Sequence, residues 1–295
     1  MIGRALAALF LASVAFAADA TLPEIYREAK AALEAGDAAR CAELLEPALR
    51  DAQGDQVAPA QLALGIAWLR LGKADAAVTV LEKAAPHFAE TPGAPNAFAP
   101  LGDALRATGR TDEARRAYAQ AGKGESANAR YARARLHELD GEAHERAAEY
   151  TKAAEAYLLG ADVLLALGVD DKAYLADARV LFERVARGTG KGGKEDWRGE
   201  PTARAVFGLG EVERASGRLA EAIAYYQRTF VSWVKYPQWA ARAYLRAAEC
   251  MDKLGKRDFA IRHLRELVRK IDKYGKLPEY QEAKRQLRAW GEDVR

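Results

Sequence analysis

The residues that come closest to a ligand-binding motif lie in a glycine-rich stretch at 188–200. Gly188, Gly193 and Lys194 fit the Gly-x-x-x-x-Gly-Lys pattern, whose backbone N–H groups and lysine cradle phosphates. The next residue is a glutamate where such a loop needs a magnesium-binding Ser or Thr, and its carboxylate would repel phosphate. The preceding pattern is also helical, whereas a phosphate loop follows a strand. We therefore interpret 188–200 as a loop inserted between helices, in which Trp197 either tucks back onto a helix or serves as a contact.

Other candidate catalytic groups are isolated. His137 and His144 have glutamates around them, but the His-Glu-x-x-His spacing of a zinc site is missing, and Gly141 between them predicts a helix break. We therefore interpret His137 and His144 as solvent-exposed residues of a helix hairpin and not as metal ligands. No Gly-x-Ser-x-Gly motif occurs, and no pair of carboxylates is marked out as general acid and base. The sequence predicts a protein that is not an enzyme and that needs no metal or cofactor.

The composition favours helices throughout. Alanine supplies 66 of the 295 residues and proline only 10, and alanine loses no side-chain entropy in a helix. With 45 Lys and Arg against 42 Asp and Glu, the net charge is only +3. A nucleic-acid-binding domain usually has a strong basic excess, so we expect no nucleic-acid partner.

The first seventeen residues have the pattern of an export signal. A short segment ending in Arg4 precedes the apolar run from Ala5 to Phe16, and Ala15-Phe16-Ala17 fits a cleavage site before Ala18. The run is shorter than the roughly 20 residues of a membrane span, so no transmembrane segment is expected after cleavage. No cysteine follows the cleavage site, which argues against a lipid anchor. Residues 1–17 are thus predicted to be a signal peptide, and the protein to be periplasmic or secreted.

The remainder, 18–295, shows an internal repeat. Five glycines occur at intervals of 36, 37, 108 and 38 residues: Gly36, Gly72, Gly109, Gly217 and Gly255. The first four share a Gly-x-x-x-x-small-x-x-x-large-x-x-small setting, and the last is a looser copy with Leu267 at the final position. Because 108 is three times 36, the long interval has room for two more copies. The clearest copies also carry a Leu-Gly pair seven residues before the shared glycine, as at Gly65, Gly102 and Gly210.

These residues predict a helix hairpin. The Leu-Gly pair lets a second helix approach the first closely, and the shared glycine ends the first helix in a left-handed conformation. The small-large-small triplet then packs the second helix back onto the first. One hairpin cannot bury both of its faces, so neighbouring hairpins must stack. Cys41 and Cys250 belong to the first and last copies, so we expect two small buried residues without a disulfide.

From Leu22 to Tyr274 the pattern resembles the tetratricopeptide repeat family, whose unit has 34 residues, and the leader suggests an exported bacterial member. The resemblance implies an all-α fold: a right-handed α-solenoid of about seven helix hairpins. A capping helix at 278–291, opened by Pro278, is expected to cover the last hydrophobic face.

The middle of the array departs from this alternation. Residues 127–139 predict a first helix, but 143–167 is one long amphipathic run and 171–187 another. A bend near Gly160 would restore the alternation, with 142–159 as a second helix and 161–167 as a short first helix. Farther along, a dense aromatic run predicts packing between repeats, the alternative being a binding hot spot: Tyr225, Tyr226, Phe230, Trp233, Tyr236 and Trp239.

The family resemblance also implies that first helices line a concave groove. The face of each first helix that is turned away from its second helix supplies the candidate partner-binding residues: Tyr26, Lys30, Leu62, Ile66, Leu69, Asn96, Asp103, Arg106, Arg204, Phe207, Glu211, Arg214, Arg242, Leu245, Glu249 and Asp252. Packing of these side chains against neighbouring first helices is the alternative.

The resulting hypothesis is an exported, non-catalytic scaffold that binds a peptide or protein segment in this groove, within an envelope-associated complex. Two alternatives stay open. One is a cell-wall or polysaccharide-acting enzyme, which would need two close, buried carboxylates with opposed pKa shifts. The other is a purely architectural subunit of an envelope complex.

Overall fold

A computed structural model describes residues 20–188, 199–270 and 274–294 of the chain. Within these ranges every regular element is helical, with fourteen α-helices in sequential antiparallel pairs and one short 3-10 helix. The all-α solenoid prediction is therefore confirmed. The predicted signal peptide and Trp197, with most of the 188–200 loop, lie outside the described residues.

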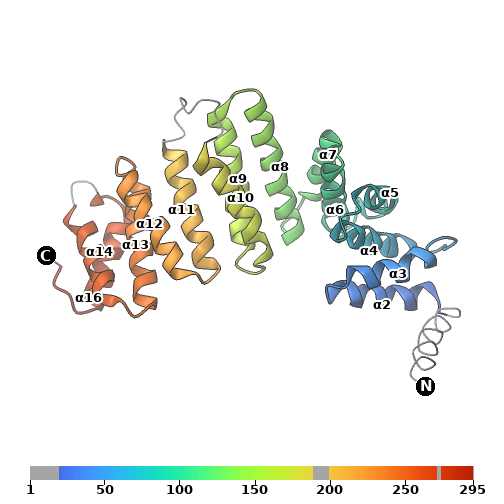
Figure 1. The fold of residues 1–295 in the computed structure, drawn as a ribbon, viewed down its shortest axis with the longest axis horizontal. Helices are drawn as coiled ribbons and strands as arrows, with labels where there is room; N and C mark the ends of the chain where they lie inside the picture. The colour runs from blue at the N-terminus through green and yellow to red at the C-terminus, as the bar shows by residue number, and fades with distance from the viewer. Residues whose placement is uncertain (1–19, 189–198, 271–273, 295) are drawn as a thin grey trace, which may run out of the picture. The chain divides into compact units, whose positions relative to one another are not determined.

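The chain divides into two compact units, residues 1–132 and 133–295, called here the N-terminal and C-terminal units. The N-terminal unit ends within α8 (Ala127–Arg146). It holds three helix pairs, drawn in blue to green in Figure 1: α2 (Leu22–Glu34) with α3 (Ala38–Ala48), α4 (Val57–Arg70) with α5 (Ala74–Ala84), and α6 (Ala94–Ala107) with α7 (Thr111–Ala121). The 3-10 helix η1 (Ala85–Phe88) follows α5.

The C-terminal unit continues from the rest of α8. Its further helices are antiparallel neighbours, drawn in green to red in Figure 1: α9 (Tyr150–Leu167), α10 (Ala173–Arg187), α11 (Glu200–Ala215), α12 (Leu219–Ser232), α13 (Pro237–Lys253), α14 (Arg257–Arg269) and α16 (Pro278–Ala289). The last of these confirms a helix at the predicted capping position, and it packs on both α13 and α14.

The shared glycines end the first helices as expected. All five have positive φ angles, from 71° at Gly255 to 88° at Gly36. Glycine adopts this left-handed region without the penalty that a Cβ atom brings, so the chain reverses within two or three residues. The next helix then starts at once, as α12 does two residues after Gly217.

The Leu-Gly pairs also act as predicted. A Cβ atom on Gly102 would lie 2.5 Å from the Tyr118 ring, and one on Gly210 would lie 2.5 Å from the Tyr226 ring. At Gly65 the partner is the Leu81 side chain, also at 2.5 Å. Each large side chain is fully buried and comes sixteen residues after its glycine. Only a hydrogen atom fits at these glycines, which is why the two helices of a hairpin pack so closely.

The expected arrangement of the middle helices is wrong in two places. Gly141 does not break a helix, because α8 runs through it to Arg146; the glycine instead makes room for the Tyr157 ring, which a Cβ atom would approach to 2.4 Å. The chain turns at residues 147–149, where Ala148 has a φ angle of 58°. Nor does a bend at Gly160 divide the next run, since α9 is a single helix from Tyr150 to Leu167.

Helix α9 restores the alternation in another way. It packs against α8 through Tyr157 and against α10 along its length. In the C-terminal unit α9, α11, α13 and α16 then contact one another in series, as α2, α4 and α6 do in the N-terminal unit. The whole of α9, and not a short fragment, therefore begins the next hairpin.

The aromatic run packs between hairpins, as predicted. Tyr226, Phe230 and Trp233 are buried, and the Phe230 and Tyr244 rings stack with centroids 3.9 Å apart. Trp233 packs on Val206 of α11. These rings hold α11, α12 and α13 together, which is the role that aromatic clusters often have in helical cores.

Candidate functional site

A pocket of about 240 Å³ opens between α11, α13 and the start of α16 in the C-terminal unit. Its apolar floor consists of Phe207 and Leu245, and charged side chains surround this floor: Glu211, Arg242, Arg246 and Glu279. We call it the α11–α13 pocket. Phe207, Glu211, Arg242 and Leu245 were among the predicted groove residues, so the structure brings these four together.

The floor of the pocket is held by aromatic packing. The Phe207 ring lies 5.5 Å from the Tyr226 ring and 5.7 Å from the Trp239 ring, measured between centroids. Trp239 in turn lies beside two guanidinium groups, those of Arg242 at 5.0 Å and Arg204 at 6.0 Å from its centroid. Cations at these distances from an aromatic ring are attracted to its face. The floor is therefore a fixed apolar surface with arginines at its edge.

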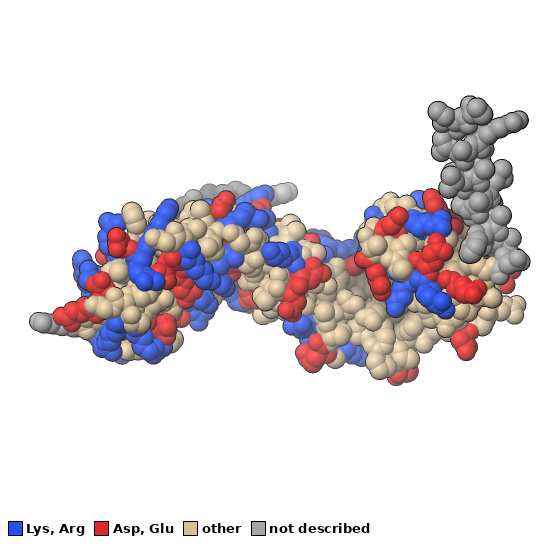
Figure 2. Space-filling model, turned by 90° about the horizontal axis from the view of Figure 1, so that it is seen from below, with Lys and Arg blue, Asp and Glu red and all other residues tan. Residues whose placement is uncertain are grey.

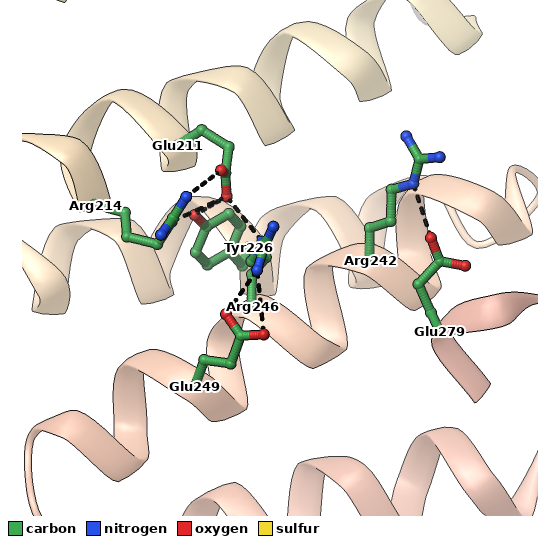
Figure 3. A network of polar contacts seen from close by, with 7 residues as sticks. All are labelled: Glu211, Arg214, Tyr226, Arg242, Arg246, Glu249 and Glu279. Carbon is green, nitrogen blue, oxygen red and sulfur yellow. Dashed lines mark hydrogen bonds and ion pairs between the residues drawn. The ribbon is translucent and has the colours of Figure 1, made fainter. Parts of the chain in front are cut away.

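Glu211 is the centre of a polar network on one side of the pocket (Figure 3). It accepts hydrogen bonds from the Tyr226 hydroxyl at 2.5 Å and from Arg214 Nη2 at 2.7 Å, and Arg246 Nε lies 3.4 Å away. Burial raises the pKa of the Tyr226 hydroxyl, and the Glu211 carboxylate raises it further. The hydroxyl thus stays protonated and donates. Because these groups come from α11, α12 and α13, Glu211 joins three helices.

A second ion pair stands on the opposite side of the pocket. Arg242 Nε lies 2.9 Å from Glu279 Oε1, and the Arg242 side chain is 47% exposed. In Figure 3 the two terminal nitrogens of Arg242 point away from Glu279. Arg242 can therefore donate further hydrogen bonds to a bound group without releasing its glutamate.

The Glu211 arrangement has a counterpart in the N-terminal unit. Asp103, which follows Gly102 as Glu211 follows Gly210, accepts a hydrogen bond from the Tyr118 hydroxyl at 2.6 Å and another from Tyr131 at 2.9 Å. In both hairpins a tyrosine from the second helix packs on the glycine and donates to the next residue, while the following helix supplies another polar partner, Tyr131 or Arg246. Both carboxylates thus link successive hairpins, the packing role considered in the sequence analysis.

The other predicted groove residues of the N-terminal unit lie in more ordinary surroundings. Tyr26 and Ile66 are half-buried against the core of the first two hairpins, and Lys30 is exposed, 3.8 Å from Glu34. Asn96 accepts a hydrogen bond from Asn128 at 2.7 Å. Three more are half-buried: Leu62, Leu69 and Arg106. Their role as partner contacts stays a prediction.

Four predicted groove residues of the C-terminal unit lie outside the pocket. Arg204 pairs with Asp162 of α9, and Arg214 with Glu211. The remaining two are acidic and pair with arginines, Glu249 with Arg246 at 2.8 Å and Asp252 with Arg257 at 2.7 Å. These side chains therefore connect helices or neighbouring turns in the folded unit.

Sequence reasoning missed two residues of the pocket, Arg246 and Glu279. Arg246 comes four residues after Arg242, so the helical spacing that selected Arg242 also places it on that face. Glu279 lies on α16, which was assigned only a capping role. Because α16 contacts α13 directly, the capping helix supplies one side of the pocket.

The remaining candidate chemistry is structural. His144 pairs with Glu149 at 2.6 Å, and in the described part of the chain no cluster of His, Cys, Asp and Glu could hold a metal ion. Cys41 and Cys250 are free and buried, and burial raises the pKa of the Cys250 thiol to about 11. A thiol with such a pKa is a weak nucleophile near neutral pH. In the pocket, Glu211 and Glu279 each lie in an ion pair with an arginine. Such paired charges can orient a bound group.

Comparison with known proteins relates one segment of the chain to a repeat family. Residues 202–270, which cover most of α11 and all of α12, α13 and α14, match the family model described as "Tetratricopeptide repeat". The segment 202–270 is therefore similar to tetratricopeptide repeats. Proteins built from these repeats generally mediate protein–protein interactions and are usually non-catalytic. A comparison with curated proteins found no match.

Solved structures with similar folds include several tetratricopeptide repeat proteins. One, from Parabacteroides merdae, is 14% identical, with 89% of this chain and 96% of that chain covered and a TM-score of 0.38. Another, from Thermus thermophilus, is 19% identical over 77% of this chain and 98% of that chain, with a TM-score of 0.36. A third is the TPR2AB domain of yeast Sti1 in complex with pHSP90, at 16% identity, 90% and 96% coverage, and a TM-score of 0.34. Because these identities and scores are low, the resemblance to tetratricopeptide repeats rests on the match at 202–270.

Proposed function

We propose that the protein is an exported scaffold whose C-terminal unit binds a segment of another protein in the α11–α13 pocket. The general role of tetratricopeptide repeats supports the interaction function. The observation that carries the choice of site is the pocket itself, in which an apolar floor of Phe207 and Leu245 is edged by the half-exposed Arg242. Binding sites commonly combine an apolar cavity with a few polar groups that orient the guest.

The pocket also indicates the chemistry of the guest. Its floor accepts an apolar side chain, and the outward nitrogens of Arg242 fit a carboxylate close to that side chain. The guest is therefore an extended or helical segment with an apolar residue next to an acidic one. Glu211 already accepts hydrogen bonds from Tyr226 and Arg214 and is in an ion pair with Arg246, so it does not bind the guest directly.

Export and an envelope location are part of the same proposal. They are supported by the leader pattern at 1–17. In its native bacterial cell, the protein is expected to begin at Ala18 and to be released with the periplasmic contents or secreted. Intact-mass measurement of the purified protein and N-terminal sequencing check this. A chain that retains Met1 and stays in the cytoplasm would contradict export without affecting the pocket.

Site-specific crosslinking in cells tests the pocket. A photoreactive amino acid is placed at Arg242, and a matched control is placed at Gln227, an exposed residue of α12 outside the pocket. We expect a discrete adduct from position 242 that is absent from position 227. Phe207→Ala should weaken binding of the captured protein by about tenfold or more, the effect of losing a central aromatic contact.

The outcome that contradicts the proposal is the same set of adducts at positions 242 and 227. Charge reversal at Arg204 or Arg214 is a poor test, because both arginines form ion pairs within the unit and their loss would disturb the fold. Phe207→Ala is the better test. Its circular dichroism spectrum is compared with that of the native protein, so that a loss of binding is not caused by a loss of fold.

A further inference from the structure

The end of the chain is much more basic than the remainder. Residues 253–295 contain thirteen lysines and arginines against seven aspartates and glutamates. The preceding 252 residues contain 32 lysines and arginines against 35 aspartates and glutamates. The small net charge of the whole chain thus hides a strong local excess. Such an asymmetry indicates a surface that attracts anions.

Part of this excess lies on the exposed face of α14, which also carries Asp258. Arg262, Arg265 and Arg269 are exposed and spaced three and four residues apart, so they lie along one side of the helix. Arg265 pairs with Glu292, but neither Arg262 nor Arg269 is in an ion pair with a described residue. Lys253 and Lys256 are exposed at the turn that precedes α14. Figure 2 shows Lys and Arg side chains at this end of the chain, at the left of the view, with Asp and Glu side chains among them.

Two large apolar side chains are exposed among these cations. Phe259 of α14 is 51% exposed, and Leu254 at the preceding turn is 42% exposed. The Arg262 guanidinium lies 4.1 Å from the Phe259 ring centroid, so the cation and the ring share one surface. The buried face of α14, formed by Ala260, Leu264 and Leu267, packs in the core of the unit. The exposed apolar groups are therefore additional to those that the fold requires.

This basic α14 surface is defined by Lys253, Leu254, Lys256, Phe259, Arg262 and Arg269. It is separate from the α11–α13 pocket, because no residue of α14 lines that pocket. Basic groups that flank exposed aromatic and aliphatic side chains are typical of helices that lie on a membrane surface, where the apolar groups enter the headgroup region. Each Lys or Arg near an anionic leaflet adds to the attraction.

We propose that the basic α14 surface binds the surface of a membrane that contains anionic lipids. The contact is peripheral, because the remainder of α14 stays packed in the protein. In the described ranges, no helix is both long and apolar enough to cross a bilayer. Attraction between exposed charges is screened within roughly 8 Å at physiological ionic strength, so binding should weaken with added salt. The proposal does not depend on the occupant of the pocket.

Vesicle sedimentation with the full chain tests this. Vesicles of phosphatidylcholine mixed with phosphatidylglycerol are compared with vesicles of phosphatidylcholine alone. We expect binding to the anionic vesicles that salt reverses, and at least about tenfold weaker binding when Arg262→Glu and Arg269→Glu are combined. Phe259→Ala should weaken binding less and should leave the salt dependence unchanged.

The matched control combines Arg27→Glu with Arg50→Glu, which makes the same charge change at exposed positions of the N-terminal unit. It should bind like the native chain. A chain that begins at Ala18, the form that the proposed export would release, is measured alongside, so that any affinity of the apolar segment 5–16 for lipid is separated from that of the α14 surface. Equal loss in the control, equal binding to both vesicles, or no binding by the native chain would overturn the proposal. So would retention on immobilised polyglutamate without vesicle binding, which would point to an acidic protein.

Discussion

Replacing Gly210 with valine is expected to destabilise the C-terminal unit by about 3 kcal/mol. The first added carbon would lie 2.5 Å from the Tyr226 ring, and that ring has no room to move. It is fully buried, packed beside Phe207 and anchored by its hydroxyl on Glu211. Urea denaturation followed by circular dichroism measures the change in the free energy of unfolding.

Two controls separate this packing effect from the loss of glycine as such. At Gly217 a Cβ atom meets nothing within 4 Å, and Gly217→Ala should cost only about 1 kcal/mol, from the left-handed backbone. In a double variant, Tyr226→Ala removes the ring that the valine would strike. The double variant should then be no less stable than Tyr226→Ala alone. If the changes in unfolding free energy of Gly210→Val and Tyr226→Ala simply add in the double variant, the contact between Gly210 and Tyr226 does not explain the lower stability of Gly210→Val.

Glu213→Ala is expected to cost about 3 kcal/mol of stability, near the lower limit for breaking a buried ion pair. Glu213 is only 4% exposed, and it accepts hydrogen bonds from Arg179 of α10 and from Arg218, which directly precedes α12. Its loss would leave two arginines without their shared partner. Both keep some access to solvent, which limits the cost. Thermal and urea unfolding measure it.

Glu183 is the matched control, because it also pairs with Arg179, at 3.8 Å, but near the surface. Glu183→Ala should cost less than about 1 kcal/mol, as exposed pairs do. An equal cost for the two variants would contradict a special role for the buried carboxylate.

The same residue predicts a pH dependence. Burial raises the pKa of Glu213, but the hydrogen bonds from Arg179 and Arg218 outweigh burial and hold this pKa below its usual value. Because the folded-state pKa is lowered, Glu213 contributes its full stabilisation above the unfolded-state pKa of about 4.3. This stabilisation is lost as the pH falls through the folded-state pKa. The stability difference between the native protein and Glu213→Gln should therefore shrink on acidification. A constant difference would contradict this.

The hairpins could be predicted from sequence because local chemistry determines them. A glycine with positive φ ends each first helix, and a second glycine admits a large side chain sixteen residues later. The same spacing relates Gly141 to Tyr157, and with it the correct course of α8 through Gly141 could have been predicted. The helix break predicted at Gly141 is wrong because this glycine makes room for the Tyr157 ring and does not end the helix.

The site could be predicted only in part. Helical spacing placed Phe207, Glu211, Arg242 and Leu245 on facing surfaces, and these residues line the pocket. It could not show that Arg204 reaches Asp162, or that Glu279 of α16 reaches Arg242. Such pairs join residues about 40 positions apart in the sequence, and they depend on the register between helices, which the packing of the whole unit determines.

The double packing of α9 limits how this protein can be re-engineered. Repeat arrays are commonly shortened or lengthened by whole two-helix modules, since each module contacts only its neighbours. Here α9 packs on both α8 and α10. Modules can therefore be excised or duplicated on either side of this point, between Gly36 and Gly109 or after Gly217. A cut through 127–187 would leave one helix facing solvent with its apolar side exposed.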